Sequence, residues 1–184
     1  KEMSRKYKMS SIQKRIYALD MMQEDNTAYN VPILIRLGGF IDLRRLNQAF
    51  YQVIKKHEIL RTFFSNDDEK FYQNVVDDLK VDIQVVSVLD MDSNGIMNLA
   101  AKYIKPFNLT ELPLMRFYIF RTKFEDYMLF DIHHIICDGI SLGILFNELS
   151  EAYLGKELKS GQYQYKNYKK KKNKKDFSEH KHFW

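Results

Sequence analysis

The sequence has one cysteine, three prolines and seven glycines among its 184 residues. The single cysteine, Cys137, excludes an intramolecular disulfide and any metal site built from several thiolates. No stretch sustains the roughly 18 apolar residues of a membrane helix. The first residue is Lys1, which suggests an excised or trimmed chain, and the polar N-terminus lacks the apolar run of a secretory signal. We therefore expect a cytoplasmic protein that does not associate with membranes.

The net positive charge of the chain comes from the C-terminal segment. Residues 161–184 hold eight lysines against two acidic residues, a net charge of +6, whereas the whole chain carries 29 basic and 24 acidic residues, a net charge of +5. Residues 1–160 therefore have a net charge of −1, so the main body is not basic. The lysine run contains no arginine to fork onto phosphates or bases, and we expect no nucleic-acid partner.

Apolar residues at helical spacing predict four helices. A short helix is expected over residues 10–22, with a serine as its cap. A longer one follows Asp42, which is a favourable N-cap, and runs to about His57. A third is predicted over residues 95–105 and a last one over residues 141–155, ending at a glycine that suits the left-handed conformation.

Short runs rich in β-branched and aromatic residues predict the strands. They lie at residues 31–39, 70–76, 81–88, 114–122 and 126–134. We expect the second and third runs to be neighbours and the last two to form a hairpin. Strands and helices intermixed in this way predict an α/β (α+β) two-layer sandwich, in which helices cover a largely antiparallel mixed sheet.

The stretch FDIHHIICDGIS, residues 130–141, places two adjacent histidines at the end of a predicted strand. Successive side chains of a strand face opposite sides, so His133 and His134 cannot both enter one site unless the strand ends between them. The usual zinc spacings are missing, and only Asp131 and Asp138 lie near enough in sequence to serve as a third ligand. We expect no metal site here.

Proton transfer suits this stretch better than metal binding. A neutral imidazole can accept a proton from an attacking nucleophile near neutral pH. Asp138 and Gly139 follow at a strand-to-helix turn, where free backbone N–H groups can meet a developing oxyanion. The alternative from these residues alone is a hydrogen-bonded histidine followed by a common Asp-Gly turn.

Four segments resemble one family. HHIICDGIS is similar to the HHxxxDGxS signature of condensation domains in nonribosomal peptide synthetases, whose HxxxDG part is shared with the chloramphenicol acetyltransferase-like superfamily. MSSIQKRIYAL (9–19) resembles the opening S-x-A-Q-x-R-[LM]-[WY]-x-L motif of the family, KHEILRTFF (56–64) resembles R-H-E-x-L-R-T-x-F, and DNTAYNVP (25–32) is typical of these domains. The resemblance covers about residues 7–165 and implies a chloramphenicol acetyltransferase-like lobe.

The resemblance also implies roles for individual residues. His134 corresponds to the catalytic second histidine of the family and His133 to its supporting neighbour, while Gly139 allows the backbone to approach the reacting carbonyl. Asp138 inherits an architectural role and pairs with an arginine, for which Arg61 is our candidate.

Ser141 belongs to the same supporting group as Asp138 and Arg61, since it is the last residue of the signature and the first of a predicted helix. Cys137 stands where serine is common in the family. It is expected to be a small buried residue rather than a nucleophile.

The implied reaction is amide bond formation between a donor acyl or peptidyl thioester and the amine of an acceptor aminoacyl thioester. Both substrates arrive on phosphopantetheine arms, so the cofactor belongs to the donor and acceptor carrier proteins and none is bound by this chain. The motifs of the second lobe are missing. We therefore expect residues 1–160 to form the N-terminal lobe, inactive alone, and residues 161–184 to be a lysine-rich linker and the start of a truncated helix.

Further partners implied by the resemblance are the C-terminal lobe of the same domain and an adjacent adenylation domain. Two alternatives remain beside this interpretation. One is a single-lobe acyltransferase that uses acyl-CoA and completes its cleft with further copies of itself. The other is a carrier-binding module without catalysis, and epimerisation domains share the same signature as a sibling class.

Overall fold

The computed structural model describes residues 4–23, 26–137 and 139–158. Its helices are α1 (Ser11–Met21), α2 (Leu43–Lys56), α3 (Ser93–Ala101) and α4 (Gly139–Tyr153), with short 3₁₀ helices η1 (Glu58–Arg61) and η2 (His134–Ile136). Its strands are β1 (Ser4–Lys8), β2 (Asn30–Arg36), β3 (Thr62–Asp67), β4 (Lys70–Val76), β5 (Gln84–Ser87), β6 (Met115–Arg121) and β7 (Asp126–His133). Among the helices of these residues, none is long and apolar enough to cross a membrane.

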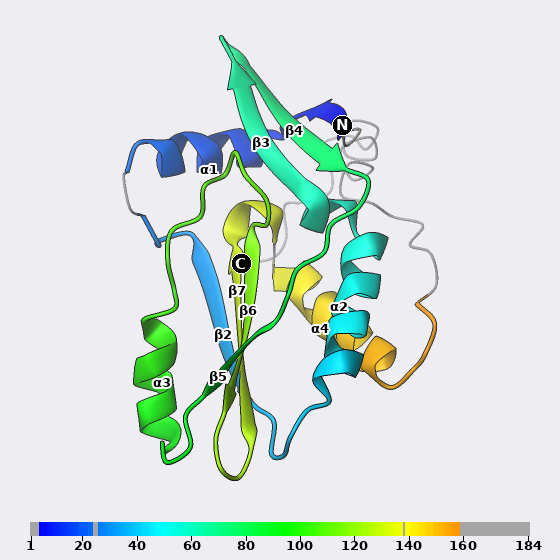
Figure 1. The fold of residues 1–184 in the computed structure, drawn as a ribbon. Coiled ribbons are helices and arrows are strands. Elements are labelled where there is room, and N and C mark those ends of the chain that lie inside the picture. The colour runs from blue at the N-terminus through cyan, green and yellow to red at the C-terminus, as the bar shows by residue number, and fades with distance from the viewer. Residues whose placement is uncertain (1–3, 24–25, 138, 159–184) are drawn as a thin grey trace, which may run out of the picture.

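The strands form two sheets. The larger sheet has the order β2-β7-β6-β5, in which β5 and β6 run parallel and the other pairs antiparallel. The smaller sheet has the order β1-β4-β3 and is antiparallel throughout. It lies with α1 at one end of the larger sheet (Figure 1). The predicted mixed, largely antiparallel sheet and the β6–β7 hairpin are therefore confirmed.

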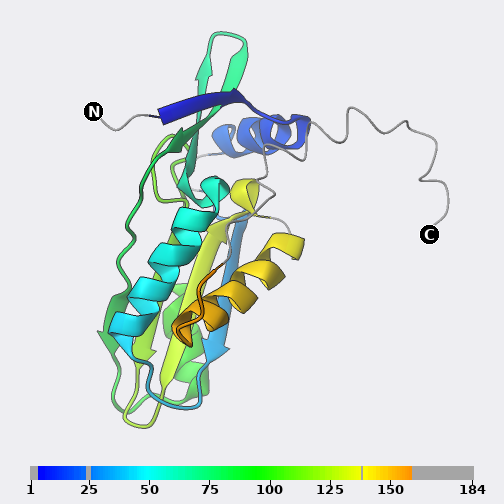
Figure 2. The ribbon, with the colours of Figure 1, turned by 90° about the vertical axis from the view of Figure 1, so that its right-hand side faces the viewer.

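Helices cover both faces of the larger sheet. On one face α2 and α4 cover the sheet (Figure 2). They pack over alternate residues of β6 and β7, including Phe117 and Phe130. On the other face α3 packs over the intervening residues, including Tyr118 and Leu129. All eight residues of β7 are consequently buried. This arrangement explains why the apolar run of β7 lacks the alternation of a half-exposed strand.

One expectation about the strands is wrong. The runs now seen as β4 and β5 were expected to be neighbours, but β4 lies between β1 and β3, whereas β5 pairs with β6 in the other sheet. An apolar pattern reports which face of a strand is buried, and it does not specify the partner strand.

Local sequence signals place the helix ends. The Ser10 side chain accepts a hydrogen bond from the Gln13 amide, and the Gln13 side chain accepts one from the Ser10 amide, which completes a capping box for α1. Asp42 caps α2 as predicted. Gly155 adopts the expected left-handed conformation after α4, with φ of 84°. Helix α4 starts at Gly139, two residues before the predicted start at residue 141.

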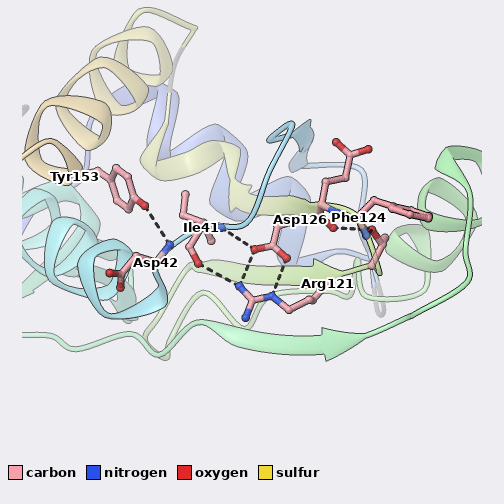
Figure 3. A network of polar contacts seen from close by, with 8 residues as sticks. Ile41, Asp42, Arg121, Phe124, Asp126 and Tyr153 are labelled. Atoms are coloured by element: carbon pink, nitrogen blue, oxygen red, sulfur yellow. Dashed lines mark hydrogen bonds and ion pairs between the residues drawn. The ribbon is translucent and has the colours of Figure 1, made fainter.

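A buried carboxylate stabilises the β6–β7 hairpin next to its turn (Figure 3). Asp126 is fully buried, and it accepts hydrogen bonds from Arg121 and from the Ile41 amide. Arg121 also donates to the Ile41 carbonyl at 3.1 Å. Next to it the Asp42 amide donates to the hydroxyl of Tyr153, on the last turn of α4. The network therefore fixes the loop between β2 and α2 against the hairpin and against α4.

Candidate functional site

The two adjacent histidines lie where the central strand ends. His133 is the last residue of β7, and His134 is the first residue of the 3₁₀ helix η2. The His133 side chain is fully buried, whereas His134 is exposed. The strand thus ends between the two histidines, and their side chains have opposite environments.

The His133 ring forms a hydrogen bond through each of its two nitrogens. Its Nδ1 accepts from the Ile135 amide at 3.0 Å, and its Nε2 lies 3.2 Å from Oδ1 of Asp20, on the last turn of α1. A nitrogen that accepts an N–H carries no proton, so the proton of the neutral ring is on Nε2 and is donated to Asp20. The His133 amide donates to the Leu114 carbonyl at 3.0 Å.

The surroundings of His133 favour the neutral form. Its ring lies beside those of Tyr29 and Phe107, with centroids 6.1 Å away in each case. Burial lowers the pKa of His133 below 6.5, and the hydrogen bond and charge of Asp20 oppose this effect without cancelling it. A buried neutral imidazole with both nitrogens engaged is suited to holding the loop in place.

His134 is held by its backbone rather than by its ring. Its amide donates to the Tyr29 carbonyl at 2.8 Å, and its carbonyl accepts from the Cys137 amide at 3.1 Å. The loop before β2 and the turn of η2 thus fix the main chain on both sides of the exposed ring. Cys137 is buried at the end of this turn, as expected.

Two of the predicted site residues lie at the start of α4. Gly139 is the first residue of the helix, and Ser141 lies in its first turn. Asp138 lies outside the described residues, so the expected Asp138–Arg61 pair stays a prediction.

Arg61 lies in η1 and is buried. Its guanidinium donates to the carbonyls of Ile54 and Lys55 in the last turn of α2, at 3.1 and 3.2 Å. It also donates to the carbonyls of Val76 and Asp77 at the end of β4. Burial lowers the pKa of Arg61. The contacts described for Arg61 therefore tie η1 to the end of α2 and to the smaller sheet.

A second polar cluster lies beside the histidines. Asp131 is fully buried on β7, two residues before His133 and on the same face, and Asn30 donates to its Oδ2 at 2.9 Å. Arg116 donates to the same oxygen at 3.3 Å, and its guanidinium lies 3.7 Å from the centre of the Phe107 ring. Within the described residues, Oδ1 of Asp131 and Oδ1 of Asn30 are buried without a hydrogen-bond partner.

Sequence reasoning did not identify Asp20, Tyr29 or Asn30 as part of this region. The last two fall in the segment DNTAYNVP, whose resemblance to the family was the available signal. No pattern pointed to Asp20. Across residues 4–23, 26–137 and 139–158, no group of three or more His, Cys, Asp or Glu side chains is arranged to hold a metal ion.

Comparison with known proteins identifies the family. The sequence model of the family described as "Condensation domain" matches residues 3–184. The chain is 37% identical over 163 residues to surfactin synthase subunit 1 of Bacillus subtilis (strain 168), and 36% identical over 163 residues to bacitracin synthase 3 of Bacillus licheniformis. These alignments cover 88% of this chain, but only 4% and 2% of the two synthases.

Solved structures agree with this assignment. The condensation domain from the monacolin K polyketide synthase MokA superimposes with a TM-score of 0.79 at 24% identity, covering 92% of this chain and 39% of that one. The X-domain from teicoplanin biosynthesis superimposes with a TM-score of 0.78 at 25% identity, covering 91% and 38%. The chain thus spans about two fifths of the solved chains. It belongs to the condensation-domain family, as its motifs predicted.

Proposed function

We propose that residues 1–160 are the N-terminal lobe of a peptide-bond-forming condensation domain of a nonribosomal peptide synthetase. Residues 161–184 are then the linker that leads toward a C-terminal lobe. The complete domain joins a donor acyl or peptidyl thioester to the amine of an acceptor aminoacyl thioester. The proposal rests on family membership and on one local observation: an exposed imidazole, His134, follows a fully buried one, His133, at the end of the central strand.

Amide bond formation requires that the attacking amine be oriented and lose a proton. The amine nitrogen attacks the thioester carbonyl, a C–N bond forms, the C–S bond breaks, and one proton passes from nitrogen to the leaving sulfur. His134 either takes this proton as a general base or accepts a hydrogen bond that orients the amine. Because its main chain is fixed at both the amide and the carbonyl, the ring is presented from a defined position.

The other residues of the signature support this ring. Gly139 gives the backbone close access to the reacting carbonyl, since it has no side chain. In the proposal, Asp138 and Arg61 form an ion pair that keeps the loop rigid, and Ser141 supports the start of α4. His133 holds the turn rather than touching substrate.

The proposed partners are a donor and an acceptor carrier protein, whose phosphopantetheine arms deliver both thioesters, and an adjacent adenylation domain. Holding two tethered reactants together supplies part of the rate enhancement, because it replaces a bimolecular encounter. One lobe provides only one wall of the cleft. We therefore expect this chain alone to form no product.

The decisive experiment measures amide formation by a full-length synthetase that contains this lobe, with loaded donor and acceptor carriers. His134→Ala should lower the rate at least about 100-fold, the lower range of general acid–base effects. Activity equal to wild type would remove the proposed role of His134. Carrier binding is measured in parallel, because binding by wild type and variant with no turnover by either would favour a non-catalytic module.

A further inference from the structure

We propose that Asp20 is a positioning residue of the histidine loop: through the His133 ring it holds the turn that presents His134. Its consequence for catalysis rests on the proposed function of His134. The placement of the loop does not depend on that function and is tested separately below.

Two hydrogen bonds in series connect helix α1 to the turn. Oδ1 of Asp20 lies 3.2 Å from Nε2 of His133, and Nδ1 of the same ring lies 3.0 Å from the amide nitrogen of Ile135. Asp20 and His133 are 113 residues apart in sequence. The imidazole therefore acts as a rigid bridge between two segments that are distant along the chain.

The bridge caps a helical turn. His133 is the N-cap of η2, and its ring satisfies the Ile135 amide, one of the N–H groups that the start of a helix leaves without a partner. Ile135 is buried, with 4% of its surface exposed, so water does not readily replace the ring. A rotation of the His133 ring would break both hydrogen bonds at once. The shape of the turn on which His134 lies therefore depends on the orientation of this ring.

The bond from His133 to Asp20 does not require an imidazolium. A charged ring would carry a proton on Nδ1, which the Ile135 amide already occupies as a donor. Asp20 thus acts as an acceptor for a neutral N–H. An asparagine at this position has an oxygen that can accept the same bond, whereas a leucine of similar size has none.

The first test uses the unmodified chain. Long-range ¹H–¹⁵N spectra of its five histidines report the protonation of each ring nitrogen. For His133 we expect a protonated Nε2 and an unprotonated Nδ1 at pH 7. The opposite tautomer, or a doubly protonated ring, would overturn the proposal, and this result needs no variant that might fail to fold.

The second test compares variants of Asp20 by hydrogen exchange of the Ile135 amide. Asp20→Leu should accelerate this exchange about tenfold or more, because the ring is no longer held. Asp20→Asn should stay within about twofold of wild type. Asp90→Leu is the control, since it makes the same replacement at an exposed position. Unchanged exchange in Asp20→Leu, or equal acceleration in Asp20→Asn, would contradict the proposal.

The catalytic consequence is measured in the full-length synthetase. Asp20→Leu should lower kcat about tenfold or more through misplacement of His134, and Asp20→Asn should restore most of it. If the tautomer and exchange results hold while His134→Ala keeps full activity, the proposed function fails and the positioning of the loop stands. If His133 has the opposite tautomer while His134→Ala is inactive, the proposed function of His134 stands and the positioning role of Asp20 fails.

Discussion

The carboxylate of Asp126 accepts two hydrogen bonds from the guanidinium of Arg121, at 2.9 and 2.7 Å. The two residues face each other across the β6–β7 hairpin, and the carboxylate is fully buried while about a third of the arginine side chain is exposed. A buried charge without a partner is strongly destabilising. Loss of Arg121 should therefore lower the stability of the fold, although the pair lies near a turn.

Replacing Arg121 by methionine should lower the free energy of unfolding by about 2–3 kcal/mol, because Asp126 is left buried with fewer partners. Urea unfolding measures this change. Arg36→Met is the comparison, since in the Arg36–Glu125 pair of the same hairpin region the arginine side chain is 67% exposed and the carboxylate, 13% exposed, keeps a hydrogen bond from Tyr127. We expect a smaller loss than for Arg121→Met, because an exposed arginine contributes less to its ion pair. Equal losses of unfolding free energy in the two variants would contradict the larger contribution of the Arg121–Asp126 pair.

The capping box of α1 offers a second test. Ser10→Ala removes the side chain that accepts from the Gln13 amide and should lower the free energy of unfolding by about 1 kcal/mol. Ser11→Ala, at an exposed position one residue later, should change stability very little. Denaturant titrations of both variants distinguish a specific cap from a general effect of removing a hydroxyl.

The lowered pKa of His133 predicts a pH dependence of stability. Burial favours the neutral ring in the folded state, so its contribution is present above the ordinary pKa of 6.5 and is lost as pH falls below it toward the lowered value. His133→Asn keeps an acceptor near the Ile135 amide but does not titrate. Its stability relative to wild type should therefore improve as pH falls from 7 to 5. A constant difference in unfolding free energy over this range would be inconsistent with a buried neutral ring.

The contribution of Asp131 to the free energy of unfolding should change with pH in the opposite direction. Burial raises its pKa above 3.8, although hydrogen bonds from Asn30 and the charge of Arg116 work against this. The carboxyl's contribution is therefore present below pH 3.8 and is lost as pH rises through the raised pKa. Asp131→Asn also introduces an N–H donor beside Asn30, whose Oδ1 is buried without a hydrogen-bond partner. Its stability relative to wild type should rise between pH 4 and 7, and urea unfolding at four pH values measures it.

Features encoded by neighbouring residues were predictable from the sequence. The capping residue Asp42, the terminal Gly155 and the β6–β7 hairpin each depend on a short stretch with a strong local preference, and all three were found. That the two histidines cannot share one face of a strand also follows from strand geometry alone. These features needed no knowledge of distant partners.

Features that depend on distant partners were missed. Strand β1 has the sequence SRKYK, which lacks any apolar alternation, and it is a strand because its backbone pairs with β4. Strand β3 was also not predicted, although its partner β4 follows it after a short turn, and β4 and β5 were wrongly placed side by side. The contact of Asp20 with His133 spans 113 residues, so no local pattern can report it. The family motifs indicated which histidine to examine, and the structure describes what holds it.

The pairing of β2 with β7 affects how the chain folds. Asn30 and Asp131, on these two strands, are separated by 101 residues, so closing the sheet requires a long and entropically costly loop. At a synthesis rate of roughly 5–20 residues per second, β7 is synthesised roughly 5–20 s after β2. The apolar side chains of β2, such as Ile33 and Ile35, are uncovered in this interval and are a site for misassembly or chaperone binding.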